Sequence, residues 1–240
     1  MILVLTMAGT YSRFRKFSYE IPKYLLPLSN RTILHYIIRN LADSHAVTKL
    51  ILVANHRDKR FHLQIKDTAE ELFDSTNIEI QYINDTDGQA ISCLRGIQNS
   101  KIIDDETPVM IHNVDTILLN RNLQLYSKMI EGCDCLVDIF ESSNKEYSYI
   151  IHDNSIVREI KEKMVISDTA SSGCYLFRNK NKILQYFDDE RCYISECILT
   201  MIQNGERVVA SPCWKESETL VLGTPEEYIN SMNSPCLGNG

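Results

Sequence analysis

The residues best suited to bind an anion lie near the start of the chain, directly after its first apolar run. Residues 2–5 form that run, and a turn of small residues around Gly9 follows it. Arg13 and Lys23 then supply two cations, the second of them fixed behind Pro22. A strand that ends in such a turn offers backbone N–H groups and positive charge to a phosphate. Taken alone the pattern is weak, because an Arg and a Lys near a glycine are more often solvated surface charges.

A carboxylate with suitable chemistry, Asp115, follows a second apolar run at residues 109–111. A hard oxygen ligand just past a buried strand can meet Mg²⁺ and a triphosphate. The alternative is an ordinary turn or helix-capping aspartate, which is common at such positions. His112 is expected to be a loop residue rather than a ligand, because magnesium prefers oxygen.

Apolar periodicity predicts that strands and helices alternate through the first half. In the helix expected at residues 62–73, Leu63, Ile65, Ala69 and Leu72 should face inward. The alternation predicts an α/β fold with a Rossmann-like mixed, mainly parallel sheet and helices on both faces. Ligands of open sheets bind beyond the C-terminal strand ends, here after residues 5, 83 and 111. The expected strands are residues 2–5, 49–54, 78–83 and 108–111, and the expected helices are residues 32–41, 62–73 and 89–97.

The second half has shorter strands separated by polar turns, with a hairpin turn predicted at Asp153 and Asn154. We expect a single domain over residues 1–240, because no linker or repeat divides the chain. Residues 1–120 would bind a nucleotide and residues 121–240 the molecule that reacts with it. The strands expected here are residues 135–140, 147–152, 156–160, 172–177, 207–210 and 219–222, and the helices are residues 194–203 and 225–232.

Composition narrows the class of partner. The 240 residues hold 25 Lys and Arg against 32 Asp and Glu, a net charge of -7, which argues against a nucleic acid polymer. No apolar run approaches the roughly 20 residues that span a bilayer, so no membrane partner is expected. The N-terminal run lacks the features of a signal peptide, which predicts a soluble, cytoplasmic protein.

The eight cysteines are expected to be buried, reduced thiols. Cys133 and Cys135 form the close pair, and no second pair or nearby His stands at ligand spacing. A zinc site is therefore not expected.

The motifs together resemble those of the sugar-1-phosphate nucleotidyltransferase family, which makes NDP-sugars from NTPs. The resemblance runs nearly end to end and implies a Rossmann-like fold of the type shared with many glycosyltransferases. The similar segments are the signature loop at residues 7–14, the Pro-Lys segment at 21–28, the turn at 87–90, the metal-binding segment at 112–115, the Glu-Lys motif at 159–163, the small-Gly-x-Tyr strand at 172–175 and the ending at 214–227.

The resemblance implies that an NMP group passes from an NTP to a sugar 1-phosphate or another phosphorylated small molecule, with release of pyrophosphate. Arg13 and Lys23 would cover the triphosphate, and Asp115 would hold Mg²⁺. CTP or UTP is favoured, for a surface polysaccharide precursor, and a small homodimer would be ordinary. The implied nucleotide-binding residues are Met7, Ala8, Gly9, Thr10, Ser12, Gly88 and Gln89, and the implied acceptor-binding residues are Glu162, Lys163, Ser172 and Gly173.

Three positions depart from the family pattern. Tyr11 replaces the second loop glycine, and Met164 replaces a proline. Val221 stands where many members have a second metal-binding Asp, and Glu218 falls on the opposite face of that strand. A regulatory domain that binds nucleotides without turnover therefore stays open as an alternative. A nicotinamide-dependent oxidoreductase is a weaker one, because the loop lacks the G-x-G-x-x-G order.

Overall fold

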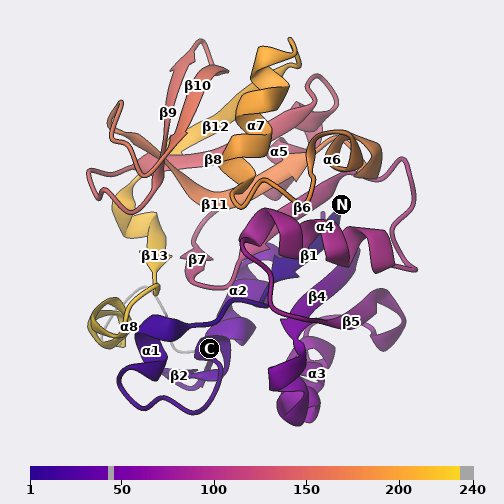
Figure 1. Cartoon of the computed structure of the whole chain (residues 1–240), viewed down its shortest axis with the longest axis vertical. Helices are drawn as coiled ribbons and strands as arrows, with labels where there is room; N and C mark the ends of the chain where they lie inside the picture. Colours follow the sequence, from indigo (N-terminus) through magenta and orange to yellow (C-terminus); the bar gives the residue numbers. More distant parts are fainter. Residues whose placement is uncertain (43–45, 233–240) are drawn as a thin grey trace.

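A nine-stranded mixed sheet forms the centre of the fold, in the order β5-β4-β1-β6-β11-β8-β12-β10-β9 (Figure 1). The structure is a computed structural model and describes residues 1–42 and 46–232. The strands of this sheet are β1 (Ile2–Thr6), β4 (Lys49–Asn55), β5 (Ile78–Ile83), β6 (Val109–Asn113), β8 (Cys135–Glu141), β9 (Ser148–Asp153), β10 (Ile156–Glu162), β11 (Thr169–Phe177) and β12 (Val208–Trp214).

The expectation of a mainly parallel sheet is wrong. β5, β4, β1 and β6 are parallel as expected, and so are β8 and β12, but β11 runs antiparallel between β6 and β8. β10 is antiparallel to β12 and to β9, and β9 also pairs with β11. The five strands β11, β8, β12, β10 and β9 close into a small mixed barrel. Parallel pairs need long crossovers, whereas a short turn such as the one at Asn154 and Ser155, both at positive φ, returns the chain antiparallel.

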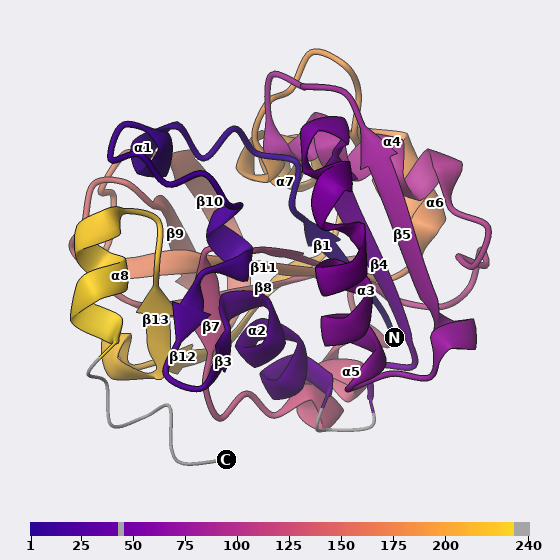
Figure 2. The same cartoon turned by 90° about the horizontal axis from the view of Figure 1, so that it is seen from below.

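Helices cover both faces of the parallel part, because side chains alternate along its strands. Leu3 and Leu5 of β1 pack in one apolar cluster with α2 (Ile33–Ala42), α3 (His62–Glu70) and α5 (Leu123–Ile130). Ile2 and Val4 pack in another with α4 (Gln89–Asn99), α6 (Lys180–Tyr186) and α7 (Ile194–Gln203). Figure 2 shows α2 and α3 on the opposite side of β1 and β4 from α4.

The expected inward face of α3 is partly wrong. Ile65 and Ala69 are buried and Leu72 packs against the core, but Leu63 is 69% exposed. Residues two apart on a helix do not share a face, so Leu63 and Ile65 cannot both point inward. The helix ends at Glu70 and is preceded by a 3-10 turn, η2 (His56–Phe61).

A strap from the C-terminal part of the chain crosses back to the first half. β13 (Thr219–Val221) pairs with β7 (Thr116–Leu118), and α8 (Pro225–Ser231) follows beside α1 (Ser12–Arg15) (Figure 1). The fully buried Arg121 pairs with Asp138 and also donates to the Thr219 hydroxyl at 2.7 Å. This buried ion pair therefore anchors the strap. The remaining short elements are η1 (Lys23–Leu25), β2 (Pro27–Leu28), β3 (Arg31–Thr32), η3 (Ser75–Asn77) and η4 (Glu216–Glu218).

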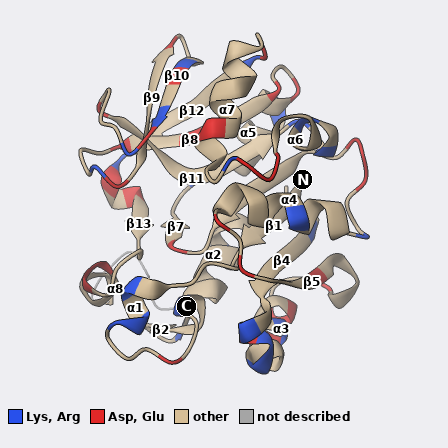
Figure 3. Ribbon diagram, in the orientation of Figure 1, with Lys and Arg blue, Asp and Glu red and all other residues tan. Residues whose placement is uncertain are grey.

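Charged residues of both signs are interspersed over both halves (Figure 3). Within residues 1–42 and 46–232, no helix is long and apolar enough to cross a membrane. The cysteines in this part of the chain are free thiols: five are buried as expected, whereas Cys192 is half-buried and Cys213 is exposed. The eighth, Cys236, lies outside the described residues.

Candidate active site

Two hollows lie at the C-terminal ends of the parallel strands and share part of their wall. The loop hollow is lined by residues 6–11, Lys23 and residues 86–89. The barrel hollow is lined by the mouth of the small barrel, the start of α7 and the strap. Gln89, Asn113 and Asp115 line both. Both hollows are concave and partly open to solvent, as sites for small molecules commonly are.

The residues singled out from the sequence divide between these hollows. Lys23 lines the loop hollow and Asp115 lines both, whereas Arg13 lines the barrel hollow and the exposed Ser12 lines neither. The proposed roles of all of them stay predictions. Of the other expected nucleotide-binding residues, Met7, Ala8, Gly9, Thr10, Gly88 and Gln89 line the loop hollow, with Gln89 also in the barrel hollow, and the four expected acceptor-binding residues, Glu162, Lys163, Ser172 and Gly173, line the barrel hollow.

Arg57 holds the loop that follows β1 by its backbone. Its guanidinium donates to the carbonyl oxygens of Ala8 at 3.1 Å and Gly9 at 3.2 Å, and to the Asp85 carboxylate at 2.7 Å. Asn55 accepts from the Arg57 N–H and donates to the same Asp85 oxygen at 3.0 Å. The sequence pattern did not single out these residues, and they link the loop after β1 to the loop after β5.

Tyr11, the departure inside this loop, adopts the left-handed conformation with φ 36°. That conformation costs a non-glycine residue about 1–2 kcal/mol. The Tyr11 hydroxyl donates to the buried Asp58 carboxylate, and the guanidinium of Arg15 lies 4.8 Å from the ring centroid. A tyrosine thus takes a backbone conformation that glycine adopts freely.

Lys23 and Asp115 form an ion pair of 2.7 Å between the Lys23 Nζ and Asp115 Oδ2 atoms. Burial acts to raise the pKa of Asp115, but the Lys23 ammonium, together with His112 and the Thr116 hydroxyl, lowers it further, so the pKa lies below its ordinary value. Asp115 is therefore an anion at neutral pH.

The oxygen atoms around Asp115 fit a Mg²⁺ ion that takes most of its ligands from water and phosphate. The Asn113 Oδ1 atom is buried and has no hydrogen-bond partner. Val221 presents an apolar side chain to the barrel hollow, and the Glu218 carboxylate instead contacts the Asn120 amide at 3.3 Å. Among the described residues no cluster of three or more His, Cys, Asp or Glu is positioned to hold a metal.

His112 is a buried residue of β6, not the loop residue expected from the sequence. Its Nε2 atom lies 2.8 Å from the Thr116 carbonyl oxygen, and burial lowers its pKa. A neutral imidazole held in this way supports the backbone beside Asp115.

Gly88 and Gly173 allow close contacts at the border of the hollows. A Cβ atom on Gly88 would lie 2.1 Å from the Cys192 carbonyl oxygen, to which Ala90 donates its N–H at 3.1 Å. Gly173 has φ 80°, and a Cβ atom there would lie 2.1 Å from the Asn113 amide nitrogen. Both glycines are required by the packing of the site, whatever ligand it binds.

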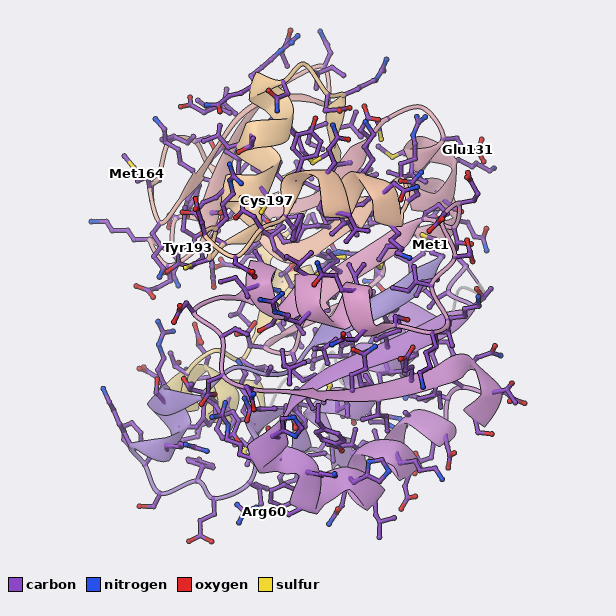
Figure 4. All side chains as sticks on the ribbon, turned by 45° about the vertical axis from the view of Figure 1, so that its right-hand side comes forward. Met1, Arg60, Glu131, Met164, Tyr193 and Cys197 are labelled. Carbon is purple, nitrogen blue, oxygen red and sulfur yellow. The ribbon has the colours of Figure 1, made fainter. Side chains whose placement is uncertain are left out.

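Hydroxyl and carboxylate groups line the barrel hollow. Glu162 accepts hydrogen bonds from the Ser148 hydroxyl and, at 2.8 Å, from the Ser195 hydroxyl. Ser172 is 4% exposed, and its hydroxyl has no hydrogen-bond partner within the described chain. The Lys163 ammonium donates to the Tyr193 hydroxyl at 3.3 Å. In Figure 4, Tyr193 lies on the opposite side of the molecule from Met1, the residue before β1.

The comparisons with known proteins agree with this arrangement. A family model described as nucleotidyl transferase matches residues 2–228, so the chain belongs to the nucleotidyl transferase family. A search of curated proteins by sequence finds no match.

The fold is that of NDP-sugar pyrophosphorylases. The nucleoside-diphosphate-sugar pyrophosphorylase of Vibrio cholerae RC9 is 22% identical with a TM-score of 0.83, over 96% of this chain and 99% of that one. A UDP-glucose pyrophosphorylase complexed with UDP-glucose is 15% identical with a TM-score of 0.78, over 100% of both chains. The UTP-bound UGPase of Acinetobacter baumannii is 14% identical with a TM-score of 0.74, over 97% and 92%. At these identities the likeness shows the shared fold.

Proposed function

We propose that the protein transfers an NMP group from an NTP, with CTP or UTP favoured, to a sugar 1-phosphate or a similar phosphorylated small molecule. Pyrophosphate is the other product. The observation that carries the proposal is the wall shared by the loop hollow and the barrel hollow, where Gln89, Asn113 and Asp115 face both. Two ligands bound in hollows that share a wall can bring their phosphates into contact.

In the proposed reaction an oxygen of the acceptor phosphate attacks the α-phosphorus of the NTP in line. A phosphorus–oxygen bond forms there, and the bond to the bridging oxygen of pyrophosphate breaks. The acceptor phosphate is already an anion, so the reaction requires no protein nucleophile or general base. The protein contributes by positioning the two ligands and stabilising negative charge.

The cations that line the two hollows would bind different parts of the two ligands. Lys23 lines the loop hollow and would bind the triphosphate. Arg13 lines the barrel hollow, which favours a contact with phosphate oxygens where the two ligands meet. Lys163, which directly follows β10, would bind the acceptor phosphate.

The proposed acceptor contacts use the carboxylate and hydroxyl groups of the barrel hollow. Glu162 would accept hydrogen bonds from acceptor hydroxyls, and Ser172 offers a hydroxyl without a partner in the described chain. Asp115 and Asn113 are the residues that would hold Mg²⁺, which when bound supplies positive charge to the phosphates. The product would serve as a cytoplasmic precursor of a surface polysaccharide.

Pyrophosphate release tests the proposal. The protein is incubated with each of the four common NTPs and a panel of sugar 1-phosphates and phosphorylated alcohols, with and without Mg²⁺. We expect release with CTP or UTP and one class of acceptor, and its loss in the Asp115→Asn variant. The matched control is Asp104→Asn, a carboxylate outside both hollows.

Val221 favours a second candidate, a domain that binds nucleotides without turning them over. An apolar side chain faces the barrel hollow where a second carboxylate would assist metal binding. Binding of CTP or UTP measured by calorimetry, together with no pyrophosphate release over the whole panel, would support this candidate and reject the transferase.

A further inference from the structure

Asp58 is a buried carboxylate that lies beneath the loop hollow and does not line it. It belongs to η2, directly after Arg57, and is 1% exposed. Both of its oxygens are used: Oδ1 accepts from the Tyr11 hydroxyl, and Oδ2 accepts from the Tyr24 hydroxyl at 3.1 Å. A buried carboxylate needs such partners, and hydrogen bonds to a charged acceptor are roughly twice as strong as neutral ones.

The two tyrosines come from the two segments that shape the loop hollow. Tyr11 ends the loop after β1 and lines the hollow with its left-handed backbone. Tyr24 is fully buried and directly follows Lys23, whose ammonium is paired with Asp115. Through these hydroxyls Asp58 joins the loop and the lysine segment.

Other contacts agree with a positioning role at this point. Burial and the nearby Asp58 carboxylate raise the pKa values of Tyr11 and Tyr24, so both phenols keep the proton that they donate. The Arg57 guanidinium, one residue away, lies 5.6 Å from the Tyr11 ring centroid. Adjacent residues of η2 thus hold the loop by its carbonyl groups and by its tyrosine.

We propose that Asp58 is a positioning residue for the nucleotide site: it fixes the left-handed Tyr11 and the Lys23 segment in the geometry that binds the triphosphate. In this chain the Tyr11–Asp58 hydrogen bond holds a tyrosine in a backbone conformation that glycine adopts freely. The inference rests on the proposed function only in taking the loop hollow as the nucleotide site.

Tyrosine-to-phenylalanine substitutions remove each hydrogen bond while the ring stays in place. We measure the Kd of UTP and of CTP in Mg²⁺ by calorimetry for wild type, Tyr11→Phe and Tyr24→Phe. Each variant should weaken binding roughly tenfold, which corresponds to about 1.4 kcal/mol. The double variant should weaken binding by much less than the product of the two effects, because both tyrosines act through one carboxylate.

Tyr186→Phe is the matched control for loss of stability alone. The Tyr186 hydroxyl also donates to a carboxylate, that of Glu206 at 2.7 Å, and Tyr186 lines neither hollow. Its melting temperature should fall about as much as that of Tyr11→Phe, whereas its Kd should stay within roughly twofold of wild type. Equal Kd values for Tyr11→Phe, Tyr24→Phe and Tyr186→Phe would overturn the inference.

A second pair of variants isolates the backbone of Tyr11. Tyr11→Ala and Tyr11→Gly both lose the hydroxyl, but glycine adopts the left-handed conformation freely and alanine does not. Tyr11→Gly should therefore bind UTP or CTP more tightly than Tyr11→Ala, and the reverse order would contradict the backbone role. A wild-type protein that binds no NTP would reject the proposed function and this inference together, whereas normal wild-type binding with unaffected variants would reject this inference alone.

Discussion

Two cations of the hollows, Lys23 and Arg13, each have a carboxylate partner within the protein. Lys23 and Asp115 are 15% and 32% exposed at their side chains, and Arg13 and Glu146 are 53% and 54% exposed. An exposed ion pair contributes between about 0 and 1 kcal/mol to stability, so little holds Arg13 on Glu146. Arg13 can therefore leave Glu146 at little cost in stability.

Arg13→Ala should lower the proposed turnover by roughly 100-fold, because a charge-stabilising contact in the transition state is lost. Its melting temperature should match that of wild type. Arg31→Ala is the control: Arg31 pairs with Glu71 at 3.1 Å with similar exposure and lines neither hollow. Steady-state kinetics and thermal denaturation of both variants test this prediction. Near-normal turnover of Arg13→Ala would refute the proposed role of Arg13 in the reaction.

The Lys23–Asp115 ion pair predicts a specific acid dependence of stability. The folded state holds the pKa of Asp115 below its ordinary 3.8, so the carboxylate stabilises the fold above that pH and loses this effect as the pH falls through the folded value. The difference in unfolding free energy between wild type and Asp115→Asn should thus be constant from neutral pH to about pH 5 and shrink below about pH 4. Urea titrations across this range measure it, and an unchanged difference in acid would contradict the pairing.

The site is only partly readable from the sequence. The loop after β1, Lys23 and Asp115 stand out because their residue types and chain order suit a polyanion. Ser195 and Asn113 carry no such signal, since their roles arise from which strands become neighbours. Asp58 is the clearest example. In the sequence it resembles an ordinary surface acid in a polar turn, whereas in the structure it is buried and accepts hydrogen bonds from Tyr11 and Tyr24.

At the scale of elements, substitutions at two glycines of the loop hollow should differ in their effect on stability. A Cβ atom on Gly9 would meet nothing within 4 Å, whereas one on Gly88 would overlap the Cys192 backbone. Gly9→Ala should keep the stability of wild type and weaken nucleotide binding, because its methyl group extends into the hollow. Gly88→Ala should lower the unfolding free energy by about 1–3 kcal/mol as well, through overpacking. Urea unfolding and UTP or CTP calorimetry on both variants test this, and a destabilised Gly9→Ala would contradict it.

The prediction of elements from sequence succeeds where the periodicity is strong. α2, α4, α7 and the strands β1, β4 and β5 lie within a few residues of expectation. The sequence pattern does not predict α5, α6 or β7, nor does it predict that β11 runs antiparallel to its neighbours. Local periodicity gives the type of an element, whereas strand partners depend on contacts between residues far apart in the chain.

At the scale of the whole molecule, the sheet is continuous between the part rich in parallel strands and the barrel. β6 and β11 join them over four residue pairs, and both apolar clusters draw on strands from each side. We therefore expect the predicted single domain to unfold in one transition. Calorimetry tests this: the calorimetric and van't Hoff enthalpies should agree, and two separated transitions would show that the parts fold independently.

The ion pairs of the two hollows also affect how nucleotide binding responds to salt. Salt screens the attraction between free, exposed cations and a polyanion, so the affinity of such cations falls as ionic strength rises. Here a bound phosphate would replace Asp115 on Lys23 and Glu146 on Arg13, and the carboxylates would pass to magnesium or to water. Binding becomes an exchange of partners inside a protein of net charge -7, so the affinity should depend only weakly on ionic strength. Such a site would keep its selectivity at high ionic strength, because its shape and the exchange of ion-pair partners govern binding more than long-range attraction does.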